Sequence, residues 1–418
     1  MVITLLLFLL FAFLIVRLVR HATTGLTMPE ALMAFGFKAL MACAYGYLFM
    51  HYYGGDDTWK YNQLSLHEYK LLMEHPGEFF WELTPATAWR NSGGHIWQAF
   101  SLYLVDLEYC MIAKTLGIFN IISRGNYYAN AIFFSFLTFW GHYWLFQLLA
   151  GIFPQKRKLL IAAIFFFPPV VFWLSGIRAD GLILVFLSLS LLHAWKWIER
   201  HRKTAILHML LGLAGIFILR NEIILLLAPA LISWLIIVRF NRKPIHVLSI
   251  VYGIAVIVFF GSTRLSGVPN LPAMIVVRQE EFMALKGNTR FQLDTLQPTI
   301  GSFLQVLPQA ISNTFLRPYI WEAHGILQIM TALEIMFLWA LILCAIVRRD
   351  KSIKYRTHPL LLIMLIFSVS LYLFIGYITP FPGAIVRYKI IPELFLLTIL
   401  CISTSTPKRY FKPLTQNS

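Results

Sequence analysis

The run ITLLLFLLFAFLIV at residues 3–16 decides the architecture of this chain, because every side chain in it except one threonine is apolar. No basic residue precedes the run, whereas Arg17, Arg20 and His21 follow it. A secretory signal peptide carries its basic residues before the apolar run, so this arrangement favours a retained membrane helix. Because positive charge stays on the cytoplasmic side, we expect the N-terminus outside.

The composition extends this interpretation to the whole chain. Of the 418 residues, 59% are hydrophobic and only 13% are charged, and the mean hydropathy is +0.70. Such values are typical of a polytopic helical membrane protein. Basic cytoplasmic loops account for the formal net charge of +16, so no nucleic-acid partner is expected. The four cysteines form no CxxC pair, which argues against a disulfide framework or a zinc site.

Apolar runs long enough to span a bilayer recur along the chain and predict an all-α, multi-pass protein with a single transmembrane domain, residues 1–418. About eleven transmembrane helices are expected by the length rule, near residues 3–19, 31–52, 129–153, 158–176, 180–198, 205–221, 222–239, 245–262, 327–347, 358–378 and 384–402.

Basic residues test the direction of these spans. Alternate connections carry Arg17 and Arg20, Lys156 to Lys158, Lys196 with Arg200 to Lys203, Arg239 to Lys243, Arg348 to Arg356, and Lys408 to Lys412. All six clusters fall on one side if the N-terminus lies outside and the C-terminus inside.

Two long connections are then expected on the outer side, at residues 53–128 and 263–326. In the first of them, residues 63–73 and 98–119 alternate apolar and polar positions at helical spacing, which predicts amphipathic helices in the membrane interface. The second of these helices is long enough to span, but three charges near its middle would be costly in hydrocarbon. They are Asp106, Glu108 and Lys114.

An acidic pair, Asp56 and Asp57, stands in the run HYYGGDDTWK at residues 51–60. Adjacent carboxylates repel each other and lose screening water beside a bilayer, so a site that keeps both has a cation to bind or a proton to accept. We therefore expect a catalytic centre here, and a divalent ion such as Mg²⁺ or Mn²⁺ is compatible with it. The alternative is that Gly-Gly ends one helix and an aspartate caps the next.

Cations gather in four predicted turns on the same side as the acidic pair. These turns hold Arg178 with Asp180, Arg220 with Glu222, Arg317 with Glu322, and Arg387 with Tyr388 and Lys389. A lipid-linked phosphate needs cations at headgroup depth, and guanidinium binds phosphate oxygens in pairs. We therefore expect these cations around a phosphate, with Arg387 and Lys389 first. The alternative is that Arg178–Asp180 and Arg220–Glu222 are local ion pairs that close tight turns.

These motifs resemble the GT-C superfamily of integral-membrane glycosyltransferases. The run GDDTWKY at residues 55–61, in a first long outer loop with interfacial helices, is similar to the place where that fold carries its catalytic acid. The turns SGIRAD at 175–180, RPYIWE at 317–322 and GAIVRYK at 383–389 look like segments of bacterial surface-polysaccharide proteins. One departure is that the acids follow the second predicted span, whereas the family usually places its acid after the first.

The resemblance implies a polyprenyl-phosphate-linked sugar as donor and inversion at the anomeric carbon. It also implies a glycan, lipid or protein acceptor on the outer face of the bacterial inner membrane, among membrane lipids. Asp56 or Asp57 would take the proton of the acceptor hydroxyl, and the cations would stabilise the leaving phosphate.

Two other functions fit the same pattern. A polysaccharide polymerase would join lipid-linked repeat units on the same face. A flippase or transporter for lipid-linked saccharide would make no bond and would place its charges near the bilayer midplane. The candidate residues lie at the predicted outer rim instead, with Glu334 the main exception.

Overall fold

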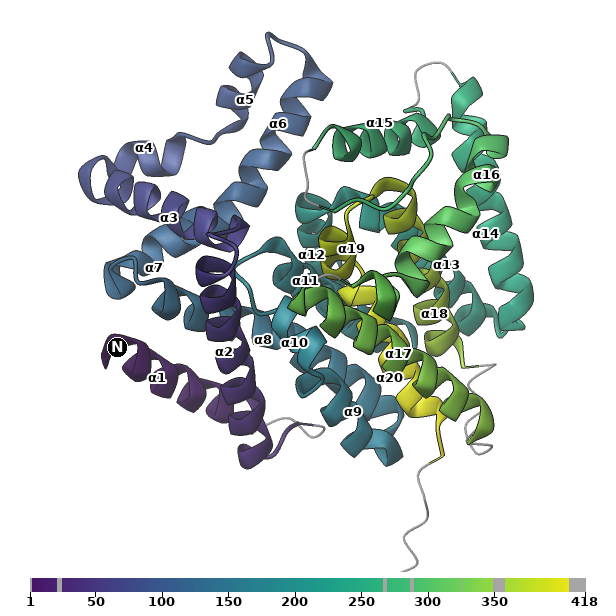
Figure 1. Ribbon diagram of the computed structural model, residues 1–418, viewed down its shortest axis with the longest axis horizontal. Coiled ribbons are helices and arrows are strands. Elements are labelled where there is room, and N and C mark those ends of the chain that lie inside the picture. The colour runs from purple at the N-terminus through teal and green to yellow at the C-terminus, as the bar shows by residue number, and fades with distance from the viewer. Residues whose placement is uncertain are drawn as a thin grey trace, which may run out of the picture.

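The computed structural model describes residues 2–20, 25–265, 269–285, 289–323, 325–348 and 358–405. In this part of the chain all regular elements are helices, which confirms the predicted all-α class (Figure 1). Three stretches used above to predict the direction of the spans lie outside the described residues, namely His21, residues 349–357 and residues 406–418.

Eight helices within the described ranges are long and apolar enough to cross a membrane. They are α1 (Val2–Val19), α2 (Met28–His51), α8 (Tyr127–Ile152), α11 (Ala179–Ile198), α13 (Asn221–Phe240), α14 (Pro244–Gly261), α17 (Ile326–Val347) and α18 (Pro359–Ile378). The chain is therefore built as a multi-pass helical membrane protein.

The run predicted as one span at residues 158–176 is instead two short helices. α9 (Arg157–Phe165) and α10 (Pro168–Trp173) are separated by two residues. Proline has no backbone N–H, and its ring clashes with the preceding turn of a helix. Pro168 can therefore begin a helix but not continue one, and it restarts the chain in a new helix.

Two further predicted spans are shorter than expected. α12 (Ala205–Leu219) has 15 residues. The run at 384–402 divides at Lys389 into α19 (Pro382–Tyr388) and α20 (Ile390–Ser403). Most residues of α20 are buried, so this helix lies inside the bundle and does not face lipid.

The first long loop, residues 53–128, folds into a helical cap. It comprises α3 (Asp57–Glu74), α4 (Pro76–Trp81), α5 (Pro85–Asn91), α6 (Ile96–Tyr109), the π-helical turn η1 (Cys110–Lys114) and α7 (Thr115–Ser123). The amphipathic helices predicted at 63–73 and 98–119 fall within these elements.

An internal ion pair explains how charges are accommodated inside this cap. Lys114 Nζ lies 2.8 Å from Glu68 Oε2 and donates to the Phe79 carbonyl at 2.7 Å. The Tyr109 hydroxyl donates to Glu68 Oε1 at 2.8 Å. A buried charge is tolerated when it is paired and hydrogen-bonded. Lys114, one of the three charges of the helix predicted at 98–119, thus finds its partners within the cap.

The second long loop, residues 263–326, packs on the end of α18. Its elements are α15 (Leu271–Ala284), α16 (Ile300–Ile311), the π-helical turn η4 (Ser312–Leu316) and the short η5 (Ile320–Glu322), and η3 (Ser262–Arg264) precedes them. The buried amide of Gln279 donates to the carbonyls of Tyr377 at 2.8 Å and Asp294 at 3.1 Å. It also accepts a bond from Leu296 N at 2.8 Å, so one side chain joins α15, the loop and α18.

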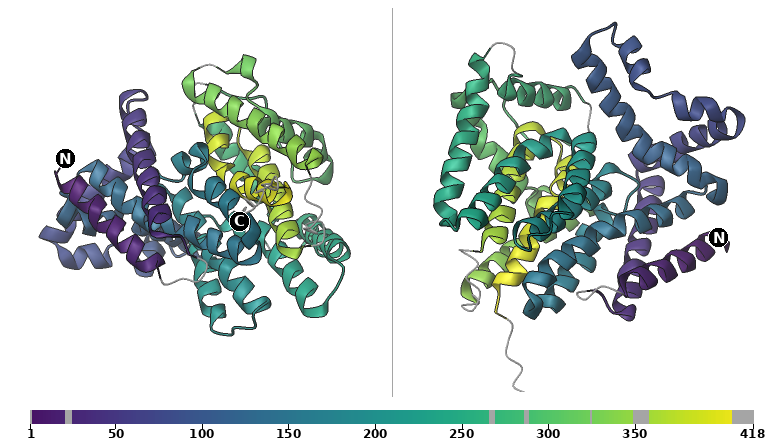
Figure 2. Two further views of the ribbon diagram at one scale, coloured as in Figure 1. Left: turned by 90° about the horizontal axis from the view of Figure 1, so that it is seen from below. Right: turned by 180° about the vertical axis from the view of Figure 1, so that it is seen from behind.

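The two long loops lie at one end of the helix bundle and α9 lies toward the other (Figures 1 and 2). At the α9 end, Lys156 Nζ donates to the Thr404 carbonyl at 2.6 Å, and Ser405 N donates to the Arg348 carbonyl at 2.7 Å. Basic connections that the charge pattern assigns to one side of the membrane therefore do meet at one end of the bundle.

Cysteine labelling tests which end faces the cytoplasm. Tyr52 and Arg242 are both exposed, beyond α2 at one end and beyond α13 at the other. In a chain whose four cysteines are replaced by alanine, Tyr52→Cys should react with a membrane-impermeant maleimide in intact cells, because the charge pattern places it outside. Arg242→Cys should react only after permeabilisation. The reverse accessibility would overturn the predicted orientation.

Candidate functional site

The loop between α2 and α3 places the acidic pair at the end of the bundle. Gly54 and Gly55 take positive φ angles of 74° and 115°, which favour glycine. Asp56 then caps α3, since its Oδ1 accepts a hydrogen bond from Thr58 N at 3.0 Å. The capping alternative thus holds for Asp56, and it leaves Asp57 in the first turn of the helix with its side chain available.

The connection between α10 and α11 lies directly against this loop. Ile177 N donates to the Thr58 hydroxyl at 3.0 Å, and Lys38 of α2 donates to the Leu174 carbonyl at 2.9 Å. Lys38 thereby satisfies a carbonyl at the end of α10, where the helix dipole favours a cation. Together these two bonds fix the position of Arg178, which begins α11.

Arg178 holds both aspartates of the acidic pair. Its Nη1 lies 3.1 Å from Asp56 Oδ2, and its Nη2 contacts Asp57 Oδ2. The Tyr45 hydroxyl accepts from the same Nη1 at 2.7 Å and donates to Asp56 Oδ2 at 3.2 Å. A guanidinium shared between two carboxylates explains how adjacent acids coexist here.

Arg387 brings a third segment of the chain, α19, to the same cluster. Its Nη1 lies 3.4 Å from Asp57 Oδ2, and its Nε lies 3.4 Å from Asp180 Oδ2. Its Nη2 donates to the hydroxyl of the neighbouring Tyr388 at 2.8 Å. The buried Nε makes no hydrogen bond among the described residues, and its charge is paired with Asp180.

The two aspartates have different surroundings. The Asp56 side chain is 13% exposed and both of its oxygens are bonded, whereas Asp57 is 59% exposed and its partners all contact Oδ2. Burial raises the pKa of the Asp56 carboxyl above its ordinary value, and Arg178 partly offsets this effect. Asp56 therefore organises the site, and Asp57 presents a free carboxylate oxygen to an incoming group.

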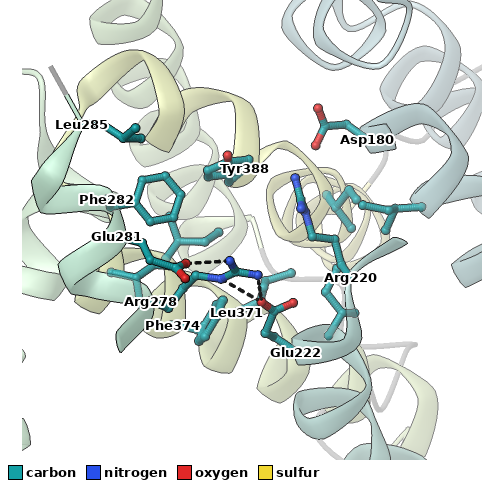
Figure 3. A pocket seen from close by; sticks show the side chains of 15 residues that line it. Asp180, Arg220, Glu222, Arg278, Glu281, Phe282, Leu285, Leu371, Phe374 and Tyr388 are labelled. Carbon is teal, nitrogen blue, oxygen red and sulfur yellow. Dashed lines mark hydrogen bonds and ion pairs between the residues drawn. The ribbon is translucent and has the colours of Figure 1, made fainter. Parts of the chain in front are cut away.

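A cavity of about 340 Å³ lies beside this cluster (Figure 3). Its polar lining consists of Asp180, Arg220, Glu222, Arg278, Glu281 and Tyr388. Its apolar lining comes largely from α18, through Leu371, Phe374, Ile375 and Ile378. A cavity divided in this way suits a ligand with a charged head and an apolar tail.

Arg220 is the cation that is available inside this cavity. It extends between Asp180 and Tyr388, and within the described residues it makes no ion pair or side-chain hydrogen bond (Figure 3). Burial opposes its charge, but the surrounding tyrosine and acids raise the pKa of Arg220, so it stays a cation. Arg278, by contrast, lies 2.6 Å from Glu222 and 2.8 Å from Glu281.

Two of the predicted phosphate-binding cations lie away from the cavity. Lys389 is buried 3.7 Å from Glu393, behind α19. Arg317 donates two bonds of 3.0 Å to Glu322, which is the local ion pair expected of a closed turn. The structure thus brings together Asp56, Asp57, Arg178, Asp180, Arg220, Glu222, Arg387 and Tyr388, and it places Lys389, Arg317 and Glu322 elsewhere.

Three further residues belong to the site although no role in it was predicted for them from the sequence. Tyr45 lies in an apolar run, where an aromatic residue is ordinary, and Arg278 stands among acids of the second long loop. Glu108 of α6 is close enough to Arg220 to interact with its charge, while burial raises the pKa of Glu108. Only the packing of the two long loops against the bundle reveals these contributions.

The residues do not fit a resident divalent ion. Both carboxylates of the acidic pair face Arg178, a cation that occupies the place Mg²⁺ or Mn²⁺ would take. In the described ranges, no three His, Cys, Asp or Glu side chains are grouped as a metal site requires. We therefore assign no step of a reaction to a metal.

No family model matches the chain, and no curated protein or solved structure matches it. The resemblance to the GT-C superfamily therefore stays a prediction.

Thr58→Val tests whether this hydroxyl joins the two loops that carry Asp56 and Arg178. Valine keeps the shape but leaves the buried Ile177 N–H without its acceptor, which should lower the free energy of unfolding by about 1–3 kcal/mol. Denaturation of the purified protein in detergent measures the change. Thr263→Val, at an exposed threonine, is the matched control. Equal stability of the two variants would contradict this role of Thr58.

Proposed function

We propose that this protein is an integral-membrane glycosyltransferase that moves a sugar from a polyprenyl-phosphate donor to an acceptor at the membrane surface. The observation that carries the proposal is the meeting of three distant segments beside one amphipathic cavity. These segments carry Asp57, Arg178 and Arg387. The resemblance of the acidic run to the GT-C pattern supports the same conclusion.

The cavity has a cationic part and an apolar part, and a lipid phosphate needs both. Arg220 presents an unpaired guanidinium, which binds phosphate oxygens through two parallel N–H···O bonds. The α18 side chains, such as Phe374 and Ile378, provide an apolar wall for the first isoprenoid units. A ligand with both features would fill the cavity and bury its own apolar surface.

The charge around the cavity favours a donor with a single phosphate. Arg278 is already neutralised by Glu222 and Glu281, and Asp180 faces Arg220 and Arg387. A phosphodiester brings one negative charge, which Arg220 balances, whereas a diphosphate brings more charge than this one guanidinium would balance, because Arg387 already faces Asp57 and Asp180. The donor in this proposal is therefore a sugar linked to polyprenyl monophosphate.

Asp57 is the general base in this proposal. As the acceptor oxygen bonds to the anomeric carbon, its proton passes to the exposed carboxylate oxygen of Asp57. The bond between the anomeric carbon and the phosphate oxygen breaks, and its electron pair stays on the phosphate. Arg220 and Arg387 stabilise that charge without rearrangement of the site. Attack from the face opposite the phosphate inverts the anomeric configuration.

A polymerase would use the same acid and cations and would differ only in taking a lipid-linked saccharide as acceptor. A flippase is favoured less, because transporters bind substrate near the bilayer midplane. Here Asp57, Arg178 and Arg220 lie beyond the ends of α2, at the start of α11 and at the start of α13. Their position at helix ends supports a reaction at the membrane surface.

Asp57→Asn tests the base. The amide keeps the shape of the side chain but accepts no proton, so the rate of transfer should fall about 10²- to 10⁴-fold with donor binding preserved. The assay follows release of polyprenyl phosphate from a polyprenyl-phosphate sugar by the protein in nanodiscs, with bacterial surface glycans as acceptors. Asp294→Asn, at an exposed aspartate of the second long loop, serves as the control. A full rate for Asp57→Asn would refute the proposed mechanism.

Arg220→Ala tests the phosphate site separately from the chemistry. Loss of one charge-assisted pair should weaken binding of a short-chain polyprenyl monophosphate by about 10- to 100-fold. Binding of the matching uncharged polyprenol should be unchanged, because the apolar wall remains. Calorimetry on both ligands gives the comparison, with Arg264→Ala, at an exposed arginine, as the control. Equal weakening for phosphate and alcohol would show that Arg220 does not bind phosphate.

A further inference from the structure

A second group of charged side chains lies buried where α19 meets α17 and α20, apart from the residues that line the cavity. Lys389 is 2% exposed and Glu393 is 0% exposed, and both stand at the start of α20. Glu334 of α17 is 6% exposed, and α17 packs against α20 so that the carboxyl groups of Glu334 and Glu393 interact. Intramembrane ionisable groups are costly, and they mark functional positions more often than structural ones.

The carboxyl groups of this cluster lack donors. Within the described residues, neither oxygen of Glu393 has a hydrogen-bond partner, and Oε1 of Glu334 has none. Lys389 Nζ lies 3.7 Å from Glu393 Oε2, which is an ion-pair distance but too long for a hydrogen bond. Two ionised carboxylates only accept hydrogen bonds, so they would repel each other where they meet.

The cluster also carries one negative charge in excess when both carboxyl groups are ionised. One ammonium group neutralises one of the two carboxylates and leaves a negative charge buried among apolar side chains. A metal cation would need several more oxygen ligands, whereas a proton needs only the two facing carboxyl groups. A carboxylic acid that donates to a carboxylate removes both the excess charge and the repulsion.

The neighbouring elements supply no other group that would fill this role. The helices that pack against α17 and α20 are α9, α10, α18 and α19, together with η5. Among their described titratable groups, Tyr372 of α18 faces the two carboxyls, and a phenol adds no positive charge. The other charged groups face elsewhere. Lys158 of α9 is exposed and Arg157 faces Glu30. Glu322 faces Arg317, and Arg387 faces Asp57 and Asp180.

We propose that Glu334 and Glu393 hold one proton between them, so that these residues and Lys389 form a buried proton-binding site. This inference is independent of the proposed sugar transfer. The site lies where α19 joins α20, two residues after Arg387 in the chain. Loss of the proton would leave two facing carboxylates between α17 and α20 and would push these helices apart at that joint.

Infrared spectroscopy detects such a proton directly, because a protonated carboxylic acid has a carbonyl stretch that a carboxylate lacks. The wild-type protein in nanodiscs at neutral pH should show this band, with a shift in deuterated water. Glu334→Gln and Glu393→Gln should each remove it, because one ammonium and one carboxylate then balance and no proton is needed. Lys389→Met should strengthen it, because a second proton replaces the lost ammonium. Glu74→Gln, at an exposed glutamate, should leave the spectrum unchanged.

Thermal unfolding gives an independent measurement. The folded state would bind one proton more than the unfolded chain at any pH above the ordinary pKa of a glutamate, about 4.3, so stability should fall as the pH rises from there through neutral. Either glutamine variant should flatten that dependence relative to Glu74→Gln. The proposal fails if the difference spectra between wild type and both glutamine variants contain no carboxylic-acid band. It also fails if both variants keep the pH dependence of the wild type.

Discussion

The guanidinium of Arg178, shared between Asp56 and Asp57, is the interaction on which the candidate site depends. It joins the start of α11 to the loop between α2 and α3, two segments more than a hundred residues apart in the chain. Without that cation, two neighbouring carboxylates would face each other at low dielectric and repel. Thr58 and Lys38 hold the backbone on either side, so that Arg178 has little freedom to leave.

Around that ion pair, some residues of the site hold its geometry and others are available to contact a ligand. Tyr45 is buried and Asp56 is half-buried, and both are fully bonded, so they set the geometry. Asp57 keeps one carboxylate oxygen that no described residue contacts. The same division continues in the cavity, where Arg278 is neutralised and Arg220 makes no ion pair with any described residue. A site built this way can stay ordered before a ligand binds and still offer groups to it.

The sequence allowed the helical class to be predicted, because long apolar runs indicate helices that cross a bilayer. Of the four charged turns, those of Arg178, Arg220 and Arg387 meet, whereas that of Arg317 lies elsewhere. The predicted span at 158–176 failed at Pro168, whose backbone effect outweighs hydrophobicity. Lys389 could not be placed, because α19 ends beside it and the turn sends Arg387 and Lys389 to opposite sides. Arg278 joins the site through tertiary packing, which no local pattern encodes.

The attachment of α15 through Gln279 bears on how the second long loop can vary. This amide binds one carbonyl of α18 and two backbone groups of the loop, and it is almost completely buried. The helix α15, which lines the cavity through Arg278 and Phe282, is therefore held at two adjacent residues, to α18 through Gln279 and to Glu222 of α13 through Arg278. Replacement of Gln279 would remove the polar bond between α15 and α18, and with it one of the constraints on the shape of the cavity.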